Sequence, residues 1–126
     1  MRLALFTLML CAAPALAAAP GPEGVWRTGK GPKGGFMNVR VAPCQAGGAE
    51  LCGTIVQIFD MTRTNFIGVV LIRDMAPGAD GVWTGEIWSP DKQTAYTSHM
   101  RMDGSDLEVE GCVLAICKSQ TWTRVE

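Results

Sequence analysis

Apolar and polar residues alternate with a period of two along most of the chain, as in a half-buried strand. In residues 95–103 one face carries Tyr96, Ser98, Met100 and Met102, and the other is polar. No window of ten or more residues shows the helical period of 3.6. The pattern predicts strands over residues 24–28, 36–41, 51–59, 67–73, 82–89, 95–103, 107–111 and 119–125.

The segments between these runs are short and rich in Gly, Pro, Asp and Asn, the residues that favour turns. Short connections make sequential strands antiparallel neighbours. We therefore expect an all-β protein, a small up-and-down barrel of about eight strands, because closure removes the unpaired strand edges.

The inward face of these strands supplies the candidate ligand-lining residues. An eight-stranded barrel is wide enough either to be filled by its own side chains or to hold one small ligand, and the sequence leaves both open. Strands 51–59 and 67–73 are apolar on both faces, which indicates a covered outer surface or a contact with a partner. The inward candidates are Met37, Val39, Tyr96, Met100, Met102, Leu107 and Val109.

The N-terminus resembles a secretory signal. Arg2 precedes a short apolar run, and Ala15-Leu16-Ala17 has the small-x-small pattern of a cleavage site. We expect residues 1–19 to be removed and residues 20–126 to form a single domain, periplasmic or secreted. Lipid attachment at Cys11 is the alternative, although Leu10 occupies a position that needs a small residue. No later run is long enough to span a membrane, so we expect no membrane-spanning segment.

Removal of the leader leaves four cysteines, an even number suited to two disulfides in an oxidising compartment. We expect the local pairs Cys44–Cys52 and Cys112–Cys117, each at the base of a short loop. A site with four thiolate ligands for zinc is the alternative, although neither pair has the usual two-residue spacing. We expect no metal and no cofactor.

The apolar loop Val113, Leu114, Ala115 and Ile116 stands where a tight turn normally holds Gly, Asn or Asp. We expect these residues to fold over one barrel end as a plug. The functional alternatives are a rigid apolar lip at the mouth of a ligand cavity, or a docking patch for an envelope protein.

Charge and candidate chemistry exclude several function classes. With 11 Lys and Arg against 12 Asp and Glu, the chain has no basic footprint for nucleic acid. Gly24, Gly29 and Lys30 approach a phosphate-binding loop, but Gly31 replaces the Ser or Thr that binds magnesium. His99 is the only histidine and is expected on the surface with no nucleophile nearby. We therefore expect no enzyme.

A hydrolase is the lesser alternative, with carboxylates available at Glu86, Asp91, Glu108 and Glu110. Two converging carboxylates in a cleft, or His99 hydrogen-bonded to one of them, would favour it.

Several separated motifs resemble one exported bacterial family, domain of unknown function 2147. They are residues 50–56 (ELCGTIV), 83–91 (WTGEIWSPD), 94–96, 110–112 and 117–124 (CKSQTWTR). The resemblance implies a small secreted or periplasmic barrel of calycin-like, lipocalin-related build. The polar segment after the third strand is shorter here, at residues 60–66, than is usual for the family.

A second resemblance is to the lipocalins. Gly24-Val25-Trp26 is similar to their Gly-x-Trp start, and it implies that Arg124 on the last strand packs over Trp26. The function that we expect is non-enzymatic binding of a small hydrophobic molecule inside the barrel. The alternative is an envelope protein-interaction or structural module with a filled core, which uses strands 51–59 and 67–73.

Overall fold

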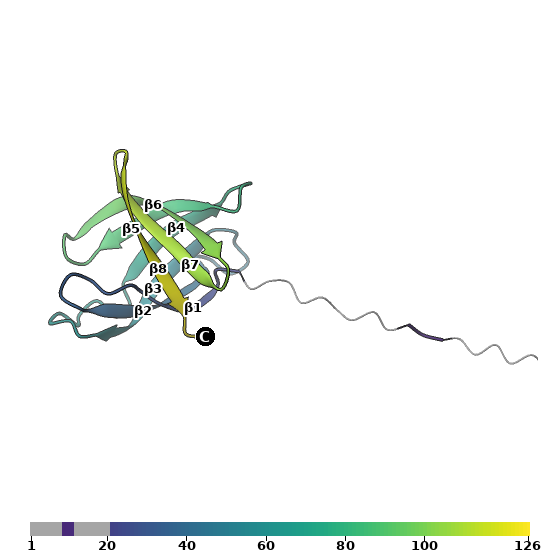
Figure 1. Cartoon of the computed structure of the whole chain (residues 1–126), viewed down its shortest axis with the longest axis horizontal. Coiled ribbons are helices and arrows are strands. Elements are labelled where there is room, and N and C mark those ends of the chain that lie inside the picture. Colours follow the sequence, from purple (N-terminus) through teal and green to yellow (C-terminus); the bar gives the residue numbers. More distant parts are fainter. Residues whose placement is uncertain (1–8, 12–20) are drawn as a thin grey trace, which may run out of the picture.

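The computed structural model describes residues 9–11 and 21–126, and the latter form a closed antiparallel barrel (Figure 1). Each strand pairs with the next along the chain, and β1 pairs with β8. The predicted fold class is confirmed. The strands are β1 (Gly24–Arg27), β2 (Phe36–Pro43), β3 (Leu51–Phe59), β4 (Val70–Pro77), β5 (Trp83–Ser89), β6 (Thr94–Asp103), β7 (Asp106–Val113) and β8 (Ile116–Arg124).

Most of the predicted leader, residues 1–19, lies outside the described residues, so its removal stays a prediction. Cys11 lies in the short described piece before the barrel and is an exposed free cysteine. Within residues 9–11 and 21–126, no helix has the length and apolar character needed to cross a membrane.

Because consecutive strands are antiparallel, their connections lie alternately at the two ends of the barrel. The β1–β2, β3–β4, β5–β6 and β7–β8 connections share one end, which we call the mouth end. The other three connections lie at the opposite end with residues 21–23 and the C-terminus, and we call this the closed end (Figure 1).

Trp26 and Arg124 join the first and last strands at the closed end. The Trp26 side chain is fully buried, and its Nε1 donates a hydrogen bond to the Pro22 carbonyl at 2.8 Å. The guanidinium of Arg124 lies 4.2 Å from the centroid of the Trp26 ring and donates to the Glu23 and Gly21 carbonyls. Gly24 makes room for this contact, because a Cβ there would lie 2.5 Å from Arg124 Nη1.

A β-bulge explains why strand 51–59 is apolar on both faces. The register between β2 and β3 shifts after Asn38, so that Val39 faces Ile55 whereas Met37 faces Ile58. The extra residue, Val56, places both Ile55 and Ile58 against the core although they are three positions apart. A strict two-residue period assigns them to opposite faces, which is wrong.

The prediction of a strand over residues 67–73 is wrong in its first three residues. β4 begins at Val70, and residues 67–69 lie in the β3–β4 connection. Two further register shifts between β3 and β4 accompany this late start. Leu71 and Ile72, which are adjacent, are consequently both buried.

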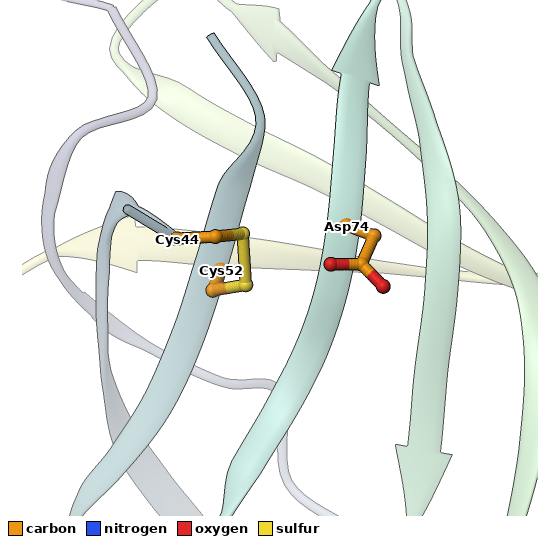
Figure 2. Close-up of side chains that lie close together, drawn as sticks. All are labelled: Cys44, Cys52 and Asp74. Carbon is orange, nitrogen blue, oxygen red and sulfur yellow. A yellow bond between two sulfur atoms is a disulfide. The ribbon is translucent and has the colours of Figure 1, made fainter. Parts of the chain in front are cut away.

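Both predicted disulfides are present, which overturns the zinc alternative. Cys44 and Cys52 connect the ends of β2 and β3 with a Cα–Cα distance of 4.9 Å, and Cys112 and Cys117 clamp the β7–β8 hairpin at 4.1 Å. Asp74 of β4 places its carboxylate beside the first bridge (Figure 2). Sulfur atoms bonded to each other offer no thiolate to a metal ion.

Candidate ligand cavity

The mouth end of the barrel is hollow. A cavity of about 370 Å³ opens there to solvent, with walls from strands around the barrel and from the connections above them. Its deeper wall is mainly apolar, because the inward faces of β2, β4, β5, β6, β7 and β8 meet in it. The residues of this wall are Met37, Leu71, Ile87, Tyr96, Val109 and Trp122.

The polar part of the cavity rim comes from the β1–β2 and β5–β6 connections and from the start of β8. Gly29, Gly31 and Pro32 of the β1–β2 connection stand on one side, with Asp91 and Lys92 of the β5–β6 connection elsewhere on the rim. Lys118 and Gln120 project from β8. Trp122 Nε1 donates a hydrogen bond to Gln120 Oε1 at 3.1 Å, which orients the amide above the apolar wall.

The predicted lining residues separate into two groups. Met37, Tyr96 and Val109 border the cavity. Val39, Met100 and Leu107 do not border it: their side chains are fully buried in the packed core, where Met102 is partly buried against them. An inward stripe runs the whole length of a strand, so alternation identifies the face of a residue but not its height in the barrel.

Sequence reasoning missed four wall positions, Leu71, Ile87, Gly111 and Trp122. Gly111 follows the inward residues Leu107 and Val109 at the two-residue period but has no side chain to fill the space. A Cβ at Gly111 would lie 3.2 Å from Ile87 Cγ2, inside the cavity wall. Continuing the Leu107 and Val109 alternation by one step would have found this position.

The apolar β7–β8 loop does not plug the barrel, so the plug expectation is wrong. Leu114 at its turn is 98% exposed. Val113 and Ile116 pair across the hairpin and border the cavity at its rim, each still more than half exposed. The hairpin extends past the barrel wall and the Cys112–Cys117 bridge closes its base, so it rises from the rim (Figure 1).

The β3–β4 connection covers part of the barrel instead. Phe66 is buried in the core cluster and meets the Trp88 ring edge to face, with centroids 5.4 Å apart. Met61 of the same connection borders the cavity. The segment of residues 60–66 therefore contributes both to the core and to the cavity wall.

A second hollow of about 240 Å³ is lined mainly by residues of the outer faces of β6, β7 and β8, together with Val82 and Met100. His99 Nδ1 lies 3.1 Å from Glu110 Oε1, and about a third of each side chain is exposed. This contact is the one that the hydrolase alternative required. The hydroxyl of Ser119, however, donates to Glu108 and not to His99. Among residues 21–126 the structure shows no hydroxyl hydrogen-bonded to His99, so the pair has no activated nucleophile.

Glu108 of this hollow has a lowered pKa. Thr121 Oγ1 donates to its Oε1 at 2.5 Å and Ser119 Oγ donates to its Oε2 at 3.0 Å. These hydrogen bonds, with a smaller contribution from the charge of Arg101, hold the pKa of Glu108 below its usual value. A general acid requires the opposite shift.

Two groups of side chains have the spacing of metal ligands, and each includes a disulfide-bonded cysteine. They are Cys44 and Cys52 with Asp74, and His99 and Glu110 with Cys112. With the bridges formed, Asp74 is the only free ligand of the first group, and His99 and Glu110 are those of the second. Neither group retains the three or four ligands of a stable site.

Comparisons with known proteins agree with the motifs. No curated protein matches the chain, and no solved structure matches it. Residues 24–124, from the first residue of β1 to the last residue of β8, match the family described as "Uncharacterized protein conserved in bacteria (DUF2147)". Because this match covers the whole barrel, the chain belongs to the DUF2147 family.

Proposed function

We propose that this protein is an exported, non-enzymatic binding protein that holds one small, mainly apolar molecule in the mouth cavity. The observation that carries the proposal is the open cavity of about 370 Å³, whose volume lies within the range of small-molecule sites. Its apolar wall offers hydrophobic burial, and the few polar groups at the rim offer orientation.

The arrangement of the wall favours an amphipathic ligand. An apolar body would lie against Leu71, Ile87 and Val109, and a polar or anionic head would remain at the rim near Lys118 and Gln120. Lysine and amide donors at the opening suit a carboxylate or sulfonate, because both are strong hydrogen-bond acceptors.

The packed part of the core supports this assignment. Val39, Met100, Leu107 and Trp26 are buried in the part of the core that does not border the cavity, so the barrel is filled below the hollow part. The alternative, a structural module with a filled core, agrees only with the part of the barrel below the cavity.

A fluorescence titration tests the proposal with 1-anilinonaphthalene-8-sulfonate and with a long-chain fatty acid as a competitor. We expect saturable binding of one dye with a dissociation constant in the range of about 1–10 μM, displaced by the fatty acid. Gly111→Leu places a side chain in the cavity and is expected to weaken binding about tenfold or more.

Thr97→Leu is the matched control, because Thr97 is exposed on the outer face of β6, opposite Cys112 of β7. It adds a similar side chain outside the cavity and should leave the affinity unchanged. Absence of saturable binding to the folded protein, or equal affinities for the two variants, would overturn the proposal.

Export is the second part of the proposal and rests on the leader-like N-terminus and on the two disulfides, which persist in oxidising compartments. N-terminal sequencing of the protein from the periplasmic or culture fraction should show a chain that begins near residue 20. A protein that keeps Met1 and stays in the cytoplasm would contradict it.

A further inference from the structure

The tip of the β7–β8 hairpin is an exposed apolar surface with no packing partner in the barrel. Val113, Leu114 and Ile116 are 56%, 98% and 74% exposed, and we call these three residues the apolar tip. They account for three of the five exposed large hydrophobic side chains among residues 21–126. The Cys112–Cys117 bridge fixes the base of the hairpin that carries them.

Leu114 has a backbone conformation that its side chain does not favour. Its φ is +56°, in the left-handed region where Gly, Asn and Asp are preferred. A polar Asn or a Gly at this position would give an easier turn and a more soluble tip. The chain instead holds an apolar residue in a costly conformation at the most exposed point of the hairpin.

Exposed positive charge lies at the same end of the barrel as the apolar tip. The mouth end has five exposed cations from three connections and β8, against the two carboxylates Asp60 and Asp91. We call the five cations the basic collar. They are Lys30, Lys33, Arg63, Lys92 and Lys118.

The closed end has the opposite sign. Six carboxylates lie on its connections, strand ends and termini, against two cations. Arg101 is exposed two residues before the end of β6, and Arg124 is occupied by Trp26 and by two backbone carbonyls. The formal charge of the whole chain, -1, therefore conceals a separation of charge along the barrel axis. The six are Glu23, Glu50, Asp80, Asp103, Asp106 and Glu126.

We propose that the mouth end docks onto an anionic phospholipid surface, with the apolar tip inserted among the acyl chains and the basic collar against the head groups. Stable attachment to a membrane takes two such signals together, an apolar anchor and a basic patch. The anionic closed end points away from the lipid, so the charge separation selects one orientation.

Docking in this orientation brings the cavity opening to the lipid. Val113, Ile116 and Lys118 belong both to the docking surface and to the cavity rim. The docking proposal does not rest on ligand binding, because the tip and the collar contact lipid whether or not the cavity is occupied.

Vesicle flotation of the full disulfide-bonded protein tests the docking proposal. We expect flotation with equimolar phosphatidylcholine and phosphatidylglycerol, little with phosphatidylcholine alone, and weaker binding as salt is raised. Leu114→Asn removes the most exposed apolar side chain and suits a positive φ, so the fold is retained. It is expected to lower the partition coefficient about tenfold.

Matched controls come from the rest of the barrel. Val125→Asn removes an apolar side chain, 46% exposed, at the closed end and should leave flotation unchanged. The double variant Lys30→Glu and Lys33→Glu should abolish binding to anionic vesicles. Arg40→Glu, an exposed position in the middle of β2, should reduce it much less.

Three results would overturn the docking proposal. They are no flotation of the unsubstituted protein, equal flotation of the Leu114→Asn and Val125→Asn variants, and a Leu114-dependent dimer without vesicle binding. The last would make a second copy of this chain the partner of the tip. Dye binding that is retained in a protein that does not float would leave the ligand proposal standing, so the two failures can be distinguished.

Discussion

The closed and mouth halves of the barrel are built from the same eight strands but use their inward residues in opposite ways. Toward the closed end, Trp26, Val39, Met100 and Leu107 leave no exposed surface, and Arg124 fastens the last strand to the first. Toward the mouth end, Gly111 leaves its inward position empty and a cavity opens. The two halves share one core, because the cavity wall residues Leu71, Val109 and Trp122 are buried in the same cluster, but only the mouth half has space for a ligand.

The largest expected difference between the halves concerns the core. Leu107→Ala removes a fully buried side chain from the closed half and should lower the free energy of unfolding by about 2–5 kcal/mol. Met37→Ala removes a half-buried side chain from the cavity wall and should cost about 1 kcal/mol, because the space it leaves joins an existing cavity. Urea denaturation measures both values. Equal losses would show that the mouth half is as important for stability as the closed half.

The two disulfides are expected to stabilise the fold by similar amounts but to differ in their effect on dye binding and on flotation. Each closes a short loop, so replacing either pair by serine should lower the free energy of unfolding by about 2–3 kcal/mol. Loss of Cys44–Cys52 should leave dye binding and flotation unchanged in the folded protein, whereas loss of Cys112–Cys117 should weaken both. Thermal denaturation, titration and flotation of the two double variants provide the comparison, which fails if both pairs affect binding alike.

A substitution at Arg124 tests how the first and last strands are held together at the closed end. Arg124→Lys keeps the charge but loses the planar group over Trp26 and one of the two hydrogen bonds to residues 21–23. We expect a loss of about 1–2 kcal/mol in unfolding free energy and no change in dye affinity. Arg40→Lys, on the exposed surface of β2, is the control. A weakened dye affinity in Arg124→Lys would mean that the two halves are coupled.

The smallest expected effect is on the pH dependence of stability. It involves Glu108, whose side chain lies on the outer face of the barrel and not in either half of the interior. Its pKa is lowered in the folded protein by hydrogen bonds to its ionised form, first from Thr121 and then from Ser119. The stabilisation is therefore present above the unfolded pKa of about 4.3 and is lost as pH falls through the folded value. Thr121→Val should raise the pKa of Glu108 in an NMR titration of its carboxyl group. The stability of this variant should approach that of the unsubstituted protein in acid; a constant difference at every pH would contradict the assignment.

The fold was predictable from the sequence because its determinants are local. Alternation gave the strands, Gly, Pro and Asp marked the turns, and the short spacings of Cys44, Cys52, Cys112 and Cys117 favoured the pairing that the structure has. Alternation assigned no inward face within residues 51–59, because the bulge at Val56 breaks the two-residue period. Which residue of a pair bulges depends on packing against the neighbouring strand, which one sequence does not display.

The site was predictable only in part. Alternation gave the inward face correctly for Met37 and Leu107, but the height of each residue in the barrel follows from strand stagger and register. The expectation that the loop Val113–Ile116 folds over one barrel end rests on the assumption that apolar residues are covered within their own chain. In the structure the Cys112–Cys117 bridge closes the base of the hairpin, and Leu114 at its turn is 98% exposed.

The most direct test of ligand binding in the mouth half is a methyl NMR titration of the protein with a long-chain fatty acid. The proposal predicts saturable shifts at the methyl groups of Met37, Leu71, Ile87 and Val109, which border the cavity. It predicts no comparable shifts at Val39, Met100 and Leu107 in the packed half. Shifts that are absent, or that are spread equally over both halves, would contradict it.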